Sequence, residues 1–228
     1  MSRTRQADTD RFYQLLHRLA AHLGGARTLD SSTAAGWPSH GVYFFYEPGQ
    51  TRADGTPRVV RVGTHALTAS SRTTLWTRLA QHRGQLTGAH PGGGNHRGSI
   101  FRHHVGTALL ATGDWPHSIT QTWRQAKIDR PARHAEDQLE RAVSQHIAKM
   151  PLIWLPVHER YQRGRIERNS IALLSCRTGG TDRPSTDWLG HYAHSEKVRT
   201  SGLWNANHVD EHHDSAFLDE LEHLIDLV

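Results

Sequence analysis

Apolar residues in the first third of the chain gather in two short runs, Gly41–Tyr46 and Val59–Gly63. Both runs are rich in β-branched and aromatic residues, and the segment between them carries glycine, proline and aspartate. This pattern predicts a strand, a loop and a second strand. The spacing then becomes helical, and four residues at i, i+3, i+4 and i+7 share one helix face: Leu75, Arg78, Leu79 and His82.

An arginine and a histidine on the same helix face as two leucines are unusual, because an inward-facing charge is costly without a partner. Arg78 and His82 are therefore candidates for a functional role. In the alternative, Trp76 and Leu79 face the core, while Arg78 lays its aliphatic part on apolar surface and keeps its charge in water. The spacing alone favours this alternative.

Further elements follow from the same patterns. Helices are predicted over residues 8–24, 117–129, 134–149 and 165–176. The proline-bounded apolar run 151–157 predicts a buried or edge strand. Residues 99–111 suit either a helix or a strand, 26–40 a linker, and the glycine-rich stretch 84–98 a loop. A last helix has one apolar face, which would pack on the body of the protein or on a second subunit: Phe217, Leu218, Leu221, Leu224 and Ile225.

Three short motifs occur in order: Gly41-Val42-Tyr43, Arg61-Val62-Gly63, and Arg78 followed four residues later by His82. In this order they resemble the GIY-YIG nuclease family, whose members carry a Glu on a later helix. The resemblance implies an α/β (α+β) fold with a small, mainly antiparallel three-stranded sheet flanked by helices. It would divide the chain into an N-terminal helix and linker (1–39), a nuclease core (40–176) with a helical insertion at about 96–150, and a C-terminal extension (177–228).

Glu167 is the candidate for that acidic residue. It lies in line with the apolar residues Ile171 and Leu174, and a carboxylate in that position is costly unless it meets a cation. A divalent metal or an arginine could be that cation. The alternatives are a first-turn Glu that interacts with the helix dipole and, as a rival metal ligand, Glu140. No apolar strand precedes Glu140, so we favour Glu167.

The resemblance also implies roles for the other residues. Tyr43 would orient or deprotonate the attacking water, Arg78 would neutralise the phosphate, and His82 would relay a proton or hold Tyr43. A free phenol ionises near pH of about 10, so Tyr43 needs neighbouring cations to act as a base. Mg²⁺ or Mn²⁺ would bind Glu167, since Mg²⁺ often takes only one or two carboxylates besides water and phosphate oxygens.

Arg61 stands where the family has a tyrosine. This substitution removes a hydroxyl, and it could either abolish cleavage or add a second guanidinium for the phosphate. Thr64 or Tyr46 could replace the lost hydroxyl, although Tyr46 should point to the strand face opposite Tyr43.

Three more residues are candidates for contact with substrate: His65, Arg83 and Asn205. Asn205 lies in a tryptophan-rich segment in which Trp188 and Trp204 either stack on bases or fill the core. The sequence from His208 to His212 matches H-x-x-E-H, a zinc-protease motif. With 19 histidines such matches arise by chance, and His103, His104 and His191 are expected at the surface.

Composition restricts the class of protein. The 228 residues are 36% hydrophobic with a mean hydropathy of −0.64, which describes a polar chain that can still bury a core. We expect neither a transmembrane helix nor a signal peptide, since the chain lacks a long apolar run. One cysteine, Cys176, excludes a disulfide framework and a multi-cysteine zinc site. A cytoplasmic location is therefore expected.

The formal charge of +5 is unevenly distributed, because the stretch from Asp210 is acidic and the remainder is more basic than the total suggests. That distribution is consistent with a polyanion partner, here DNA. We therefore expect a metal-dependent endonuclease. The alternatives are a nucleic-acid-binding module that has lost cleavage through Arg61 and a small protein without a nucleic-acid role. The sequence leaves the oligomeric state open, with a dimer as one option.

Overall fold

A three-stranded antiparallel sheet lies at the centre of the computed structural model, which describes residues 3–30, 32–87 and 91–228. The strands are β1 (Gly41–Thr51), β2 (Pro57–Gly63) and β3 (Leu152–Pro156), in the order β2-β1-β3. The predicted fold class is thereby confirmed. In the described part of the chain, no helix is long and apolar enough to cross a membrane.

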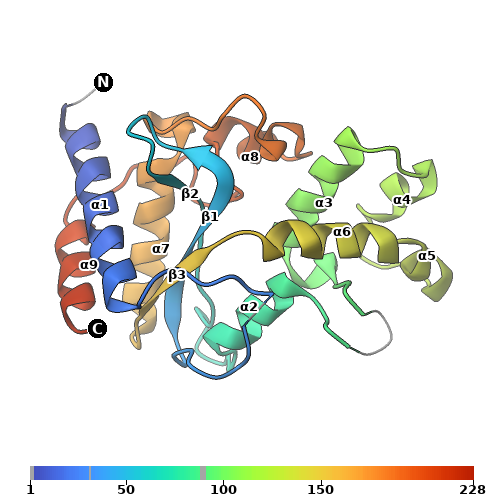
Figure 1. Ribbon diagram of the computed structural model, residues 1–228, viewed down its shortest axis with the longest axis horizontal. Coiled ribbons are helices and arrows are strands. Elements are labelled where there is room, and N and C mark those ends of the chain that lie inside the picture. Colours follow the sequence, from blue (N-terminus) through green and yellow to red (C-terminus); the bar gives the residue numbers. More distant parts are fainter. Residues whose placement is uncertain (1–2, 31, 88–90) are drawn as a thin grey trace.

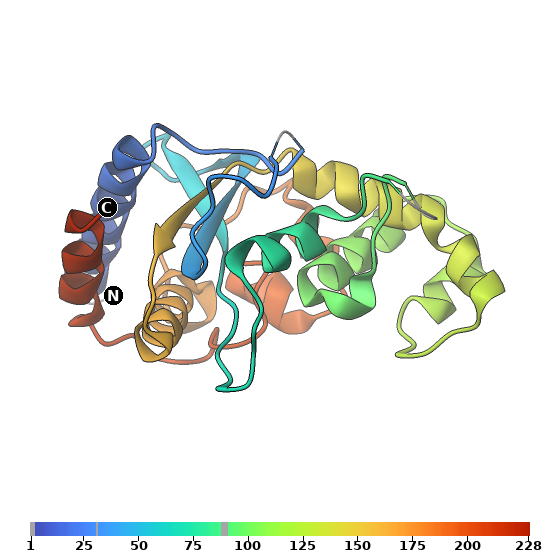
Figure 2. The same ribbon diagram turned by 90° about the horizontal axis from the view of Figure 1, so that it is seen from below.

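The sheet separates two apolar layers, because alternate side chains of β1 point to opposite faces. Val42 and Phe44 face the layer built by α1 (Arg3–His22), α7 (Arg160–Leu174) and α9 (Phe217–Asp226). Tyr43 and Phe45 face the other layer. The helices of that second layer are α2 (Leu75–Arg83), α3 (Ile100–Thr112) and α6 (Asp137–Ala148). Figures 1 and 2 show the two helical groups on opposite sides of the strands.

The expected insertion lies between α2 and β3 and adds a 3₁₀ turn, η1 (His96–Gly98), and the short helices α4 (His117–Thr122) and α5 (Arg130–Ala135). A buried ion pair holds it together, with Arg102 Nη2 2.5 Å from Glu140 Oε2. Burial opposes ionisation of Glu140, but hydrogen bonds from His96 and the charge of Arg102 lower the pKa of Glu140 to about 2. Glu140, the rival metal ligand, is therefore an internal ion-pair partner of the insertion.

The C-terminal extension contains the 3₁₀ turns η2 (Cys176–Thr178) and η3 (Leu189–Tyr192) and helix α8 (Glu196–Ser201). Its residues Trp188, Val198 and Trp204 pack into the second layer. The indole nitrogens of Trp188 and Trp204 both donate to Glu47 Oε2 at 2.9 Å, and His146 lies 2.9 Å from Glu47 Oε1. Both tryptophans are buried. They fill the core, and the interpretation that they stack on bases is wrong.

The last helix, α9, buries all five of its predicted apolar residues against the body of the protein. It contacts α1, α7 and β3. Arginines of α1 form ion pairs with its acidic face: Arg11 with Asp219 and Glu222, and Arg18 with Glu222. A second subunit is not needed to cover this helix.

Several element boundaries differ from the prediction. The loop predicted before residue 165 is wrong, because α7 begins at Arg160, where Arg163 donates to the carbonyls of Val157 and His158. The helix predicted over 117–129 ends at Thr122. The helix predicted over 134–149 is two helices, since Asp129 caps α5 and a break follows at Glu136. Ser31 of the predicted linker and residues 88–90 of the predicted loop lie outside the described residues.

His104 corrects another expectation, because it is buried in α3 rather than exposed. Its Nε2 has no hydrogen-bond partner among the described residues. Burial, together with the charge of Arg61, lowers the pKa of His104 to about 3. Between the ordinary value of about 6.5 and this lower value, the unfolded chain binds a proton that the folded chain does not. The contribution of His104 to stability therefore falls as the pH falls below about 6.5.

We predict that His104→Leu makes the protein less sensitive to acid. In the wild type, His104 should lower the free energy of unfolding by about 2 kcal/mol between pH 7 and pH 5. Urea denaturation at the two pH values measures this difference. His17→Leu, on an exposed position of α1, is the matched control and should leave the pH dependence as it is. An unchanged dependence in His104→Leu would show that the folded protein protonates this ring.

Candidate active site

A cavity of about 260 Å³ opens between β1, β2 and α7 and gathers most of the predicted site residues. It is lined by Tyr43, Arg61, Arg78, Glu167 and Asn205, together with Thr64 and His208. These side chains come from elements far apart in the sequence. Their convergence results from the short sheet, which brings the start of β1 beside the end of β2.

Tyr43 lies across Gly63, its partner in the antiparallel register of β1 and β2. A Cβ atom on Gly63 would lie 2.3 Å from the Tyr43 hydroxyl oxygen and 2.4 Å from Cζ, which no side chain could occupy. Gly41 is restricted in a similar way, because its Cβ would lie 2.5 Å from the Leu155 carbonyl oxygen. Both motif glycines thus leave room for close packing around Tyr43 and the strands.

His82 forms a hydrogen bond with the Tyr43 hydroxyl. Its Nε2 lies 2.8 Å from that oxygen, and its Nδ1 lies 2.8 Å from Ser99 Oγ. The ring is buried, and burial followed by the charges of Arg78, Arg61 and Arg102 places the pKa of His82 well below its ordinary value. The imidazole is therefore neutral near pH 7, with one nitrogen as donor and the other as acceptor.

Arg61 is buried beside the tyrosine. Its Nη1 donates to the Trp204 carbonyl at 2.6 Å, and its guanidinium lies 4.6 Å from the centre of the Phe101 ring. Burial lowers the pKa of Arg61, whereas the Tyr43 hydroxyl opposes that shift. Arginine stays protonated even so. A fixed positive charge therefore stands next to the Tyr43 oxygen.

Arg78 lies on the cavity side of α2, a helix that Thr74 caps by accepting from the Thr77 backbone. Its Nη1 donates to Gln81 Oε1 at 3.0 Å and to the Gly98 carbonyl at 3.3 Å. Leu79 is buried as expected, and Trp76 stacks on Trp37. The packing alternative is therefore correct for Trp76 and Leu79, yet the same helix geometry places Arg78 at the cavity.

Glu167 lies about two turns into α7, so the interpretation as a first-turn Glu on the helix dipole is wrong. Its Oε1 accepts a hydrogen bond from the Thr64 backbone at 3.1 Å. Burial raises the pKa of Glu167, although Arg61, His208 and Arg78 act in the opposite direction. The carboxylate has too few donors around it to offset its lost hydration fully.

The donor set near Glu167 fits a hard divalent cation that keeps much of its own hydration. No group of three or more His, Cys, Asp or Glu side chains that could hold a metal occurs among the described residues. One carboxylate at a cavity wall is sufficient for Mg²⁺ when waters and phosphate oxygens complete its coordination. The Oε2 atom of Glu167 accepts no hydrogen bond from the described residues, so it remains available to such an ion.

A comparison with family models matches the GIY-YIG domain over residues 3–228. The chain belongs to the GIY-YIG family. The match includes the N-terminal helix, the insertion and the C-terminal extension, and members of this family are nucleases. Comparisons with curated proteins and with solved structures return no match.

Two residues proposed for substrate contact lie outside this GIY-YIG cavity. His65 Nε2 is 3.2 Å from the Ser39 carbonyl, and its ring stacks on His40 with the centroids 5.5 Å apart. Arg83 donates to the Ser32 carbonyl at 2.9 Å and lies 4.8 Å from the Trp76 ring centre. Both side chains are engaged in holding the linker against α2 and the first strand.

Asn205 does line the cavity, and it also completes the edge of the sheet. Its Oδ1 accepts from the Val62 backbone at 3.1 Å, and its Nδ2 donates to the Val62 carbonyl at 2.8 Å. Thr64 donates its hydroxyl to the Gly41 carbonyl and borders the cavity, whereas Tyr46 packs in the opposite layer. Of the two hydroxyls considered as replacements at the Arg61 position, only Thr64 lies at the site.

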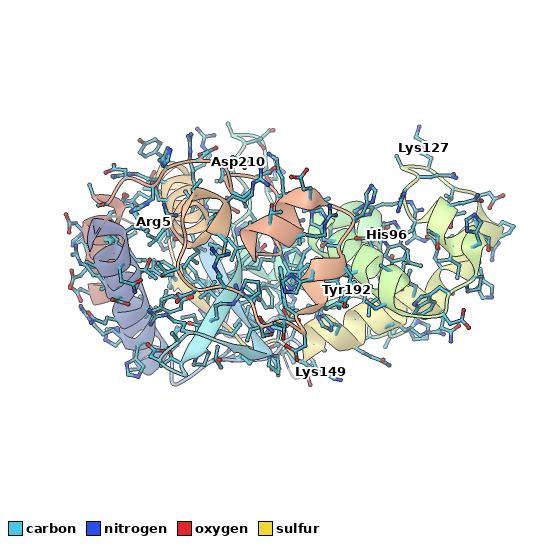
Figure 3. The ribbon with its side chains drawn as sticks, turned by 90° about the horizontal axis from the view of Figure 1, so that it is seen from above. Arg5, His96, Lys127, Lys149, Tyr192 and Asp210 are labelled. Atoms are coloured by element: carbon cyan, nitrogen blue, oxygen red, sulfur yellow. The ribbon has the colours of Figure 1, made fainter. Side chains whose placement is uncertain are left out.

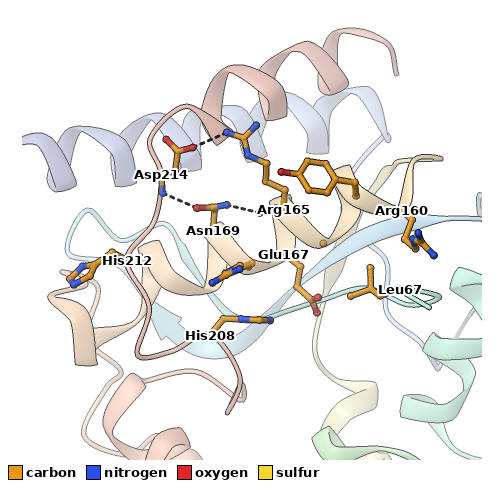
Figure 4. A pocket seen from close by; sticks show the side chains of 11 residues that line it. Leu67, Arg160, Arg165, Glu167, Asn169, His208, His212 and Asp214 are labelled. Atoms are coloured by element: carbon orange, nitrogen blue, oxygen red, sulfur yellow. Dashed lines mark hydrogen bonds and ion pairs between the residues drawn. The ribbon is translucent and has the colours of Figure 1, made fainter. Parts of the chain in front are cut away.

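His208 is a cavity residue that sequence reasoning set aside. Its backbone has a φ of 63°, an uncommon value for a residue with a side chain. Nδ1 lies 2.9 Å from Glu211 Oε1, and Figure 4 shows the ring directed toward Glu167. The H-x-x-E spacing is the sequence signal for this residue, since it reflects the contact between His208 and Glu211 and not a zinc-protease site.

We predict that Gly63→Ala lowers both stability and activity, because the added methyl group must displace the Tyr43 ring or the strand. The expected cost is about 1–3 kcal/mol, as for other overpacked sites, and urea denaturation measures it. Gly98→Ala is the control, since a Cβ there would meet nothing within 4 Å. Equal stability of Gly63→Ala and wild type would contradict this packing.

We predict that Glu167→Gln stabilises the metal-free protein at a pH where the Glu167 carboxyl is ionised. The raised pKa of Glu167 means that the folded protein is destabilised when this buried carboxyl ionises and is not destabilised at low pH, where the carboxyl is neutral. A glutamine is neutral at every pH, so the variant avoids this destabilisation. Thermal denaturation in EDTA at pH 7.5 and pH 4 should show a higher Tm for the variant only at pH 7.5. Added Mg²⁺ should raise the Tm of the wild type and leave that of Glu167→Gln unchanged.

Proposed function

We propose that this GIY-YIG protein is a metal-dependent endonuclease that hydrolyses phosphodiester bonds of DNA. The observation that carries the proposal is the convergence of the Tyr43 hydroxyl, two guanidinium groups and one carboxylate on a single cavity. A phosphodiester is an anion whose negative charge grows toward the transition state. A site that offers fixed cations and a positioned proton acceptor suits that reaction.

Tyr43 is positioned to take the proton of the attacking water. Its oxygen would accept that proton while its own proton passes to His82 Nε2, 2.8 Å away. The low pKa of His82 keeps the imidazole neutral before the reaction, so that Nε2 can accept the hydrogen bond of the Tyr43 hydroxyl. Ser99 fixes the ring through Nδ1, and the charge of Arg61 stabilises negative charge on the phenol oxygen.

Arg78 and Arg61 would stabilise the phosphate. Arg78 is partly exposed at the cavity wall and can form a charge-assisted hydrogen bond to a phosphate oxygen. Arg61 is held by Trp204 and adds a charge of fixed position. Glu167, with waters and substrate oxygens, would hold Mg²⁺ or Mn²⁺, which supplies Lewis-acid stabilisation of the charge on the phosphoryl oxygens.

A second candidate function is a DNA-binding module that no longer cleaves. Arg61 favours it, because this residue replaces the tyrosine of the family motif and its guanidinium is bound to the Trp204 carbonyl. The affinity of such a module for DNA would fall steeply with salt, because each counterion displaced from the DNA adds to the slope of log affinity against log salt concentration.

We predict that the purified protein nicks supercoiled plasmid with Mg²⁺ or Mn²⁺ and that EDTA abolishes nicking. Glu167→Gln should be inactive, and Tyr43→Phe should lose about 10²- to 10⁴-fold in rate, the usual contribution of a general acid or base. Gel analysis of single-turnover reactions measures both. Tyr192→Phe, at an exposed position in η3 (Figure 3), is the matched control and should cleave normally.

The alternatives give different results in the same assay. Nicking that survives Glu167→Gln would exclude this residue as the metal ligand. Salt-sensitive binding without nicking by the wild type would identify the binding module.

A further inference from the structure

We propose that a second, larger cavity next to the site holds an unpaired nucleotide that flanks the cleaved bond. The substrate class is then DNA with an unpaired or extruded nucleotide beside the scissile phosphate. This inference rests on the proposed nuclease function and names the substrate of the same site.

The two cavities share a wall. The second has a volume of about 600 Å³, and both are bordered by Leu67, Glu167 and His208. Figure 4 shows these three side chains on one side of α7, with Arg160 farther along the helix. A DNA strand whose phosphate lies between Arg61 and Glu167 would therefore have an adjoining nucleotide at the second cavity. A volume of this order holds a ligand of nucleotide size.

The charges of the second cavity suit a phosphate. Arg160 is exposed and has no hydrogen-bond or ion-pair partner among the described residues. Arg168 forms an ion pair with Glu211, and 60% of its side chain is exposed. Arg165, by contrast, is held by Asp214 and Glu220 and is structural. Among the described arginines that line this cavity, Arg160 is thus the one without a partner, and it is available to an anion.

An aromatic side chain stands beside that cation. Tyr161 borders the same cavity and is 79% exposed, so its ring is open to a partner from solvent. Aromatic faces of this kind stack on bases, and an adjacent arginine contacts the backbone of the same strand. The pair Arg160–Tyr161 therefore provides the two contacts that a single nucleotide needs.

An unpaired base fits these contacts better than a base pair. A tyrosine can stack only on a base face that neighbouring bases leave uncovered, as at a flap, a gap or an extruded nucleotide. Exposed apolar side chains at the rims of the two cavities support this conclusion. Leu67 is 43% exposed and Ile100 is 51% exposed, and such residues separate base steps in proteins that distort DNA.

The test uses duplex DNA and DNA with a short single-stranded flap, with 2-aminopurine at each position near the junction. Glu167→Gln protein binds the probe without cleaving it, and stacking on Tyr161 should quench the fluorescence at one unpaired position. In this background Tyr161→Ala should abolish the quenching and Tyr161→Phe should retain it. Arg160→Ala should reduce the slope of log affinity against log salt by about one.

Cleavage rates provide the second measurement. With otherwise active protein, Tyr161→Ala should lower kcat/KM for the flap substrate by about tenfold or more, and removing the stacked base should have no further effect in that variant. Arg124→Ala is the matched control, because Arg124 is an exposed arginine of the insertion that lines neither cavity. Figure 3 shows Lys127, three positions later in the sequence, at the end of the molecule away from Arg5.

The outcomes separate the two proposals. Cleavage by the wild type, with no quenching and no effect of Tyr161→Ala, would overturn the nucleotide cavity and leave the nuclease standing. Quenching that depends on Tyr161, without cleavage by any form of the protein, would support the cavity and overturn the nuclease. Absence of both cleavage and quenching would overturn both.

Discussion

The buried hydroxyl of Tyr43 is the constraint on which much of this structure depends. The ring must lie flat on β2, which only a glycine at position 63 permits, and its oxygen then needs a polar partner away from water. His82 is that partner, and it requires a second partner for its other ring nitrogen. Ser99 supplies it, so one buried oxygen fixes the strand register, the rotation of α2 and the start of α3.

The insertion is part of this support. Ser99 both bonds His82 and caps α3 by accepting from the Arg102 backbone. Arg102 then donates to the His82 carbonyl and to Glu140, which ties α6 to the same helix. Without this buried ion pair α2 would lose the neighbour that orients His82. The geometry of the site therefore depends on the insertion, which sequence analysis treats as an addition to the nuclease core.

What could be predicted from the sequence was local. The first two strands and the helix with Arg78 and His82 follow from short patterns, whereas the three-stranded sheet is expected from the resemblance to the family. The contacts of Arg61 could not be predicted, because its partner Trp204 lies 143 positions away. The same holds for the Asn205 bonds to Val62 and for the His208 ring beside Glu167. His65 and Arg83 show the converse, since both are near the motifs in sequence and point elsewhere in the fold.

The charges of the cavity also explain why a metal ion and a phosphate would depend on each other in the proposed reaction. Arg61 and Arg78 repel a divalent cation, and the Glu167 carboxylate repels a phosphate. Each ligand removes the repulsion that the other would meet, so the binding of either must raise the affinity for the second by the same factor. Burial raises the pKa of Glu167, and the charges of Arg61 and Arg78 offset that shift only in part. A proton and a metal ion would therefore compete for this carboxylate.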